Sequence, residues 1–139
     1  MPHSEARTPH VAPWLPHYDP GVPSTLAPYP DRTLLDYISD HARRHPNDPA
    51  LLFKGAAITY QALERASDSC AAGLRALGVS HGDRVGLLLP NCPQFVIAEL
   101  AAWKLGAIVA PLNPLYTDAE LELPLRENGV ETLVTLTRF

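Results

Sequence analysis

The sequence predicts an α/β fold, a β-α-β-α-β unit around a parallel sheet, preceded by a proline-rich extended arm. Two observations lead to this prediction. From residue 84 onward, strand-length apolar runs alternate with segments of helical spacing, which is typical of a parallel sheet covered by helices on both faces. Before residue 33, proline is concentrated: eight of the 15 prolines lie in the first 30 residues. We therefore divide the chain into an arm, residues 1–32, and a domain, residues 33–139.

The bulk composition limits the class of protein. With 139 residues, 46% of them hydrophobic, the chain suits one small domain or part of a larger one. Its formal net charge of −4 gives no general attraction to nucleic acid or to acidic lipid. The longest apolar stretch, residues 87–112, is interrupted by charges and prolines, so we expect no transmembrane segment. Cys70 and Cys92 do not form a CxxC pair and are interpreted as small buried residues in a reducing compartment.

The arm cannot form a helix or a central strand, because proline lacks the backbone donor that both need. Aromatic and aliphatic residues are spread between its prolines: Trp14, Leu15, Tyr18, Val22, Leu26 and Tyr29. They favour an arm that docks onto a surface, and a disordered tail is the alternative.

The domain is predicted to begin with a helix. Thr33 can cap it, with Asp36 in the capping-box position, and Pro46 ends it. Helical spacing places five residues on its apolar face: Leu34, Leu35, Ile38, Ala42 and His45.

A hairpin and a second helix follow. Residues 50–53 and 56–58 are two short strands that a two-residue turn connects. Thr59 caps the second helix, and Gly78 stops it. Its apolar stripe consists of Leu63, Ala66, Cys70, Leu74 and Leu77.

The last section carries the alternating pattern. We expect strand 84–89, helix 93–105, strand 107–112, helix 117–128 and strand 130–136. Pro93 suits the first turn of its helix, and Thr117 and Glu120 form a capping box for the next. Pro124 is unfavourable inside that last helix, so the helix is either kinked there or shorter than the pattern indicates.

The sequence lacks the common motifs of catalytic and nucleotide-binding sites. The sequence has no GxGxxG fingerprint, no GxxxxGK[ST] phosphate loop and no GxSxG elbow. His41 and His45 have the spacing of metal ligands on a helix, but no third ligand follows, so we expect one core-facing and one partly exposed histidine. Glu64 and Asp68 favour a solvated surface over an acid–base pair. We therefore predict no catalytic residue and no metal site among these residues.

Four segments, in order, resemble a known family. They are 57–63 (AITYQAL), 78–85 (GVSHGDRV), 89–95 (LPNCPQF) and 104–116 (KLGAIVAPLNPLY), which leads into Glu120-Leu121. Together they resemble the opening of the AMP-forming acyl-CoA synthetases, part of the adenylate-forming superfamily that includes peptide-synthetase adenylation domains and beetle luciferases. The resemblance covers residues 33–137. The arm segment 14–23 (WLPHYDPGVP) resembles the lead-in of long-chain fatty-acid CoA ligases in particular.

The resemblance implies that residues 33–139 are the incomplete first part of an AMP-binding N-terminal domain. The complete enzyme would use ATP with Mg²⁺ to convert a fatty acid to an acyl-adenylate and pyrophosphate, and coenzyme A would then displace AMP. The family's phosphate loop, ribose-binding aspartate and mobile lysine all lie beyond Phe139. We therefore expect the chain alone to be inactive. The resemblance also implies a cytoplasmic enzyme, with peripheral contact to the membrane as a further option.

One ligand contact is implied within the chain. In some acyl-CoA synthetases, the segment that matches Asn113, Pro114 and Leu115 lies beside the nucleotide end of coenzyme A. The alternative, which the residue types favour, is that Asn113 and Pro114 only turn the chain. Two other functions stay open: an interaction module that forms a homodimer through the N-terminal region, and an adenylation domain that loads a carrier protein.

Overall fold

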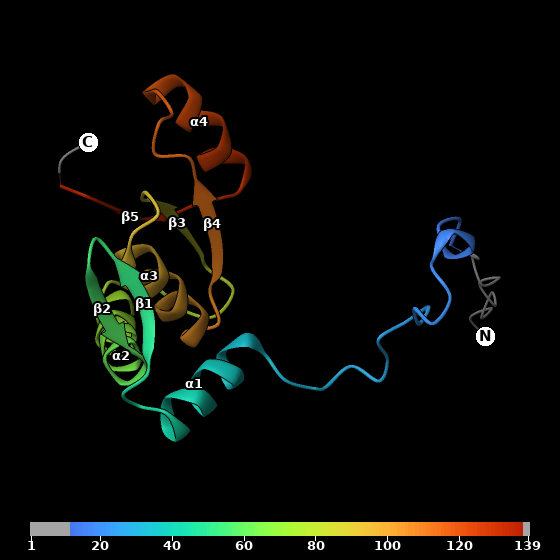
Figure 1. The fold of residues 1–139 in the computed structure, drawn as a ribbon. Coiled ribbons are helices and arrows are strands. Elements are labelled where there is room, and N and C mark those ends of the chain that lie inside the picture. Colours follow the sequence, from blue (N-terminus) through green and yellow to red (C-terminus); the bar gives the residue numbers. More distant parts are fainter. Residues whose placement is uncertain (1–11, 138–139) are drawn as a thin grey trace, which may run out of the picture. The chain divides into compact units, whose positions relative to one another are not determined.

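The computed structural model describes residues 12–137 and divides the chain into two compact units, one ending at Asp31 and the other beginning at Arg32 (Figure 1). In the described part of the first unit, the regular structure is a single short 3-10 helix, η1 (Leu15–His17). The apolar side chains that the sequence places along the arm are exposed at Trp14, Tyr18, Val22, Leu26 and Tyr29. Docking of the arm stays a prediction.

The second unit starts with α1 (Leu34–Arg44), and the predicted capping box is confirmed. The Asp36 carboxylate accepts from the Thr33 amide at 2.7 Å, and the Thr33 hydroxyl oxygen accepts from the Asp36 amide at 3.3 Å. The predicted apolar face is wrong at both ends, since Leu34 is 59% exposed and His45 is also exposed. The helix packs on its neighbours through a narrow strip around Ala42, which is buried.

The predicted hairpin is confirmed as β1 (Pro49–Phe53) paired antiparallel with β2 (Ala56–Thr59). Lys54 and Gly55 form its turn with φ values of 47° and 81°. Two consecutive positive φ values are typical of the primed turns that suit the twist of a hairpin.

Helix α2 (Tyr60–Ala76) follows, with the Thr59 hydroxyl accepting from the Ala62 amide at 3.2 Å. Its buried side chains are those of Leu63, Ser67, Ala71 and Leu74. The predicted stripe is therefore correct at Leu63 and Leu74 but wrong at Leu77, which is 79% exposed. The stripe shifts because the helix packs against α3 (Pro93–Lys104), where small residues such as Ser67 and Ala71 let the two backbones approach.

The sheet contains three parallel strands in the order β4-β3-β5, which confirms the predicted α/β fold. They are β3 (Arg84–Leu88), β4 (Ile108–Leu112) and β5 (Thr132–Thr135). Helix α4 (Asp118–Glu127) connects β4 to β5. It continues through Pro124, so the shorter helix that the sequence left open is excluded.

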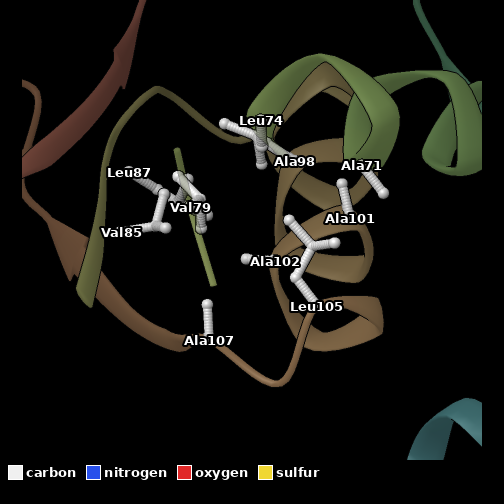
Figure 2. Packing of buried hydrophobic residues seen from close by; sticks show 10 residues of the cluster. All are labelled: Ala71, Leu74, Val79, Val85, Leu87, Ala98, Ala101, Ala102, Leu105 and Ala107. Carbon is white, nitrogen blue, oxygen red and sulfur yellow. The ribbon is translucent and has the colours of Figure 1, made fainter. Parts of the chain in front are cut away.

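The core lies between one face of the sheet and helices α3 and α2 (Figure 2). Val85 and Leu87 of β3 point into it and are fully buried. Half of the cluster is alanine, namely Ala71, Ala98, Ala101, Ala102 and Ala107. These short side chains bring the helices close to each other and to the sheet.

The opposite face of the sheet departs from the expectation of a fully covered sheet. A side chain at Gly86 would lie 2.9 Å from both Leu133 Cδ1 and Val130 Cγ1, so neighbouring apolar groups converge over this glycine. Leu133 is nevertheless 42% exposed, so the described residues cover this face only in part. None of the helices among residues 12–137 is long and apolar enough to cross a membrane.

Candidate functional site

The candidate site lies at the carboxyl edge of the parallel sheet. Because β3, β4 and β5 run parallel, their carboxyl ends lie at the same edge. The loops from β3 to α3 and from β4 to α4 both begin there (Figure 1). Open α/β sheets bind their ligands at this edge, which makes the two loops the first place to look for a site.

The loop after β4 contains the predicted contact residues Asn113, Pro114 and Leu115. The Asn113 side-chain oxygen accepts from the Leu115 amide at 3.0 Å, and its carbonyl oxygen accepts from the Tyr116 amide at 3.1 Å. This is the local hydrogen bonding by which asparagine stabilises a turn. Asn113 and Pro114 therefore do turn the chain, as the alternative interpretation required.

These hydrogen bonds also determine which polar groups of the loop remain available to bind a ligand. The amides of Leu115 and Tyr116 are engaged, and Pro114 has no N–H to donate. Among the described residues, no hydrogen bond uses the side-chain NH2 group of Asn113. The Leu115 side chain is 85% exposed. The loop thus fits one hydrogen bond and one apolar contact with a nucleotide, and it does not fit a phosphate cradle. Its contact with coenzyme A stays a prediction.

A groove of about 390 Å³ lies beside the loop after β3. One wall is strand β1, and the other is the start of α3; the lining residues are Ala50–Phe53, Asn91, Cys92, Pro93, Phe95 and Val96. Most of these side chains are apolar, so the groove suits an apolar group more than a charged one. The sequence did not indicate this groove, because its two walls come from segments about 40 residues apart.

A polar cluster, which sequence reasoning missed, connects α1, α2 and α3. The Lys104 ammonium lies 2.7 Å from Asp68 Oδ1, 2.9 Å from Ser67 Oγ and 3.1 Å from Glu64 Oε1. The Ser39 hydroxyl also donates to Glu64 Oε1, at 3.1 Å. Asp68 is exposed, as the expected solvated surface requires, whereas Glu64 is half-buried, and both carboxylates pair with one lysine. The available signal was Lys104 itself, a charged residue at the end of a mostly apolar helix.

Burial shifts the pKa of two further titratable groups. Burial raises the pKa of the Cys70 thiol and of the Glu99 carboxyl. The sequence predicted that both cysteines are buried, and the structure corrects this, since both are half-buried. No group of three or more His, Cys, Asp or Glu side chains within residues 12–137 is placed to hold a metal ion.

One of the two histidines at the end of α1 was expected to face the core, and the structure corrects this. His41 is half-buried and His45 is exposed, and the two flank Asp48 with N–O distances of 3.9 and 3.6 Å. Their rings lie 4.8 Å apart. Neither histidine faces the core, because the buried strip of α1 is centred on Ala42.

Comparison with known proteins identifies relatives. A long-chain-fatty-acid–CoA ligase of Bacillus subtilis (strain 168) is 40% identical over 124 residues, which are 89% of this chain and 22% of that ligase. Phosphinothricin tripeptide synthetase PhsC of Streptomyces viridochromogenes is 38% identical over 104 residues, which are 75% of this chain and 10% of PhsC. The chain thus spans about a fifth or less of the length of these two relatives.

A solved structure agrees with the fold. The N-terminal subdomain of Klebsiella oxytoca NpsA superposes with a TM-score of 0.73 and 26% identity, over 78% of this chain and 28% of that one. The model of the family described as AMP-binding enzyme matches residues 38–138, which are most of the domain. The chain therefore belongs to the AMP-binding enzyme family.

Proposed function

We propose that this chain is the N-terminal part of a long-chain fatty-acid–CoA ligase. The complete ligase would form acyl-CoA, AMP and pyrophosphate from ATP, a fatty acid and coenzyme A through an acyl-adenylate. It would act in the cytoplasm, with peripheral contact to the membrane as an option. Polypeptide outside these 139 residues would supply the groups that hold ATP and Mg²⁺.

The proposal rests on how many residues of this chain align with the Bacillus subtilis ligase. Residues 38–139 number 102, so a match of 124 residues includes at least 22 (124 − 102) of the residues before position 38. It therefore extends well into the proline-rich arm. The 104-residue match to PhsC is about as long as the AMP-binding segment alone. The shared arm favours a ligase over an adenylation domain that loads a carrier protein.

The test is the ATP–pyrophosphate exchange that accompanies acyl-adenylate formation. The 139-residue chain alone should show no exchange with any fatty acid. The protein expressed with all the polypeptide that its gene encodes should exchange with long-chain fatty acids and form their CoA thioesters. Exchange by the short chain would contradict the proposal that the catalytic groups lie elsewhere. Exchange with amino acids and not with fatty acids would favour the adenylation-domain alternative.

The second candidate function is an interaction module that forms a homodimer through the arm. The exposed aromatic side chains of Trp14, Tyr18 and Tyr29 favour it, because such residues provide most of the contact energy in protein interfaces. This role is compatible with a ligase and independent of its active site.

A further inference from the structure

A row of half-buried side chains follows one side of helix α3, and the proposed function assigns no role to it. Its members have helical spacing and are Cys92, Phe95, Val96, Glu99 and Trp103. The fully buried side chains of α3 lie outside this row. We refer to the five half-buried residues as the α3 row.

Two hollows lie over the α3 row, one toward each end. The groove of about 390 Å³ between β1 and α3 is lined by Cys92, Phe95 and Val96 on its α3 side. A second hollow, of about 310 Å³, has Trp103 on one side and residues 33–35, at the start of α1, on the other. No charged side chain of the described residues lines either hollow. Both hollows therefore suit apolar groups.

Glu99 lies on the turn of α3 between the two hollows. Val96 precedes it by three residues and Trp103 follows it by four, so both are its neighbours on the helix surface. Burial raises the pKa of the Glu99 carboxyl. Within residues 12–137 this carboxyl has no ion pair, and Lys104, the base nearest to it along α3, is held by Glu64 and Asp68. A carboxylate that is partly removed from water without a partner destabilises the fold.

The order of chemical groups along the α3 row indicates what kind of partner fits it. An apolar hollow, a carboxylate and a second apolar hollow together match a protein segment with one lysine or arginine between apolar side chains. From Cys92 to Trp103 the row extends about 16 Å, the length of about five extended residues. The described part of the arm does not have this composition, because residues 12–31 contain neither lysine nor arginine.

Polypeptide outside these 139 residues is abundant enough to provide the segment. The part of the Bacillus subtilis ligase that this chain matches is 22% of that protein. By the proposed function, most of the complete protein would therefore lie outside this chain. A base from that polypeptide would give Glu99 the partner that the described residues lack.

We propose that the α3 row is the docking surface for a segment of the remaining polypeptide of the same protein. One lysine or arginine of that segment pairs with Glu99, and the apolar side chains beside it enter the two hollows. The inference rests on the proposed function in one respect, namely that the chain continues into a larger protein. Glu99 is then unpaired in the 139-residue chain and paired in the complete protein.

The first experiment compares Glu99→Leu in the 139-residue chain and in the complete protein. In the short chain, leucine replaces an unpaired carboxylate, so the midpoint of thermal unfolding should rise by about 3 °C. In the complete protein, the same change leaves a buried base without its partner, so the midpoint should fall by about 3 °C or more. A shift in the same direction in both proteins would overturn the proposal. The control Glu127→Leu, at an exposed position of α4, should not give opposite shifts.

The second experiment identifies the docked segment directly. Leu52 lines the groove beside the α3 row, whereas Leu77 lies at the end of α2, and the two side chains are 78% and 79% exposed. Each is replaced in turn by photoreactive benzoylphenylalanine in the complete protein. The probe at position 52 should cross-link to a segment outside residues 1–139 that contains a lysine or arginine between apolar residues, and the control probe at position 77 should not. A cross-link from position 52 to the arm or to a second copy, or none at all, would contradict the proposed partner.

Charge reversal then tests the ion pair, because it changes both partners. Glu99→Lys alone, and replacement of the segment's base by glutamate alone, should each lower the unfolding midpoint of the complete protein. The two changes together should restore most of the loss, and a double variant no better than the singles would refute the pairing.

Pyrophosphate exchange separates this inference from the ligase proposal. A complete protein that exchanges with long-chain fatty acids but shows shifts of one direction with Glu99→Leu would lose the docking surface and keep the ligase function. Opposite shifts in a protein that shows no exchange with fatty acids would support the docking surface and contradict the ligase.

Discussion

At the scale of single residues, the backbone conformation of Gly106 determines how α3 is joined to β4. Gly106 has a φ of 73°, and its amide donates to the Trp103 carbonyl at 2.9 Å. Its carbonyl oxygen accepts from the Gly82 amide at 3.0 Å. One residue thus ends a helix and connects it to the loop before the central strand.

Replacing Gly106 by alanine should destabilise the fold by about 1–3 kcal/mol. The added methyl group would meet His81 Cδ2 at 2.6 Å, and the positive φ is strained for any residue with a Cβ. Urea denaturation followed by circular dichroism measures the change. Gly73→Ala is the matched control, because Gly73 lies inside α2 with no atom near its missing side chain. That variant should stabilise the protein by about 0.5–1 kcal/mol.

Asn113 offers a test of the proposed contact with coenzyme A. Asn113→Asp keeps the oxygen that accepts from the Leu115 amide, so the turn should survive. It removes the NH2 donor and places a negative charge where the phosphates of coenzyme A would approach. In the complete ligase, we expect KM for coenzyme A to rise about tenfold with unchanged ATP–pyrophosphate exchange. An equal loss in both half-reactions would indicate a structural role instead.

At the scale of elements, local chemistry determines where helices begin and end. Thr33, Thr59 and Gly78 are all found where the sequence predicted a cap or a stop. Burial was harder to predict, because it depends on which neighbour an element meets. Leu34 and Leu77 have the correct helical spacing, but each lies at an end of its helix and stays largely exposed.

The Lys104 cluster should contribute strongly to the packing of the helices. Lys104→Met would leave Glu64 without its cation, and Glu64 Oε2 is already buried without a hydrogen-bond partner in the described residues. We expect a loss of about 2–3 kcal/mol in the free energy of unfolding. Asp68→Asn is the control, since Asp68 is largely exposed and its removal should cost under about 1 kcal/mol. Equal losses from the two variants would contradict the central role of Glu64.

The capped segments should also make stability sensitive to acid. Hydrogen bonds from the backbone amides of Thr33, Ser80 and Thr117 lower the pKa of Asp36, Asp83 and Glu120. Their stabilisation is complete above the ordinary carboxyl range, about pH 4, and is lost as the pH falls through the lowered values of the folded state. The urea midpoint should therefore drop between pH 5 and pH 3.

The control for acid sensitivity is a carboxylate outside the caps. Asp36→Asn and Glu120→Gln should each reduce the drop in the urea midpoint, whereas Glu131→Gln should leave it as in the wild type. A drop of the same size in all four proteins would assign acid sensitivity to other groups.

At the scale of the whole molecule, the sequence was sufficient for the fold class, because strand–helix alternation leaves few ways to build a parallel sheet. The predicted strand 107–112 and helix 117–128 place the loop containing Asn113 at the carboxyl edge for the same reason. The groove between β1 and α3 and the Lys104 cluster were not predicted. Their members, such as Ser39 and Lys104, are far apart in the sequence and meet only in the folded chain.

The arm provides a prediction at this scale. If it forms the proposed homodimer, light scattering coupled to size-exclusion chromatography should give about twice the monomer mass for the full chain. Deletion of residues 1–30 should give the monomer mass. The control replaces Trp14, Tyr18 and Tyr29 together by serine, which keeps the length of the arm and removes its large apolar contacts. A full chain that is already monomeric would count against the interaction role.

The order of the strands has a consequence for synthesis of the protein. Arg84 pairs with Ile108, and Val85 pairs with Thr132, so the middle strand leaves the ribosome before either of its partners exists. The apolar side chains of β3 therefore stay without their neighbouring strands while two more helices are translated. A nascent polypeptide in this condition is a natural client for a chaperone at the exit tunnel, and slow codons after β3 would lengthen that exposure.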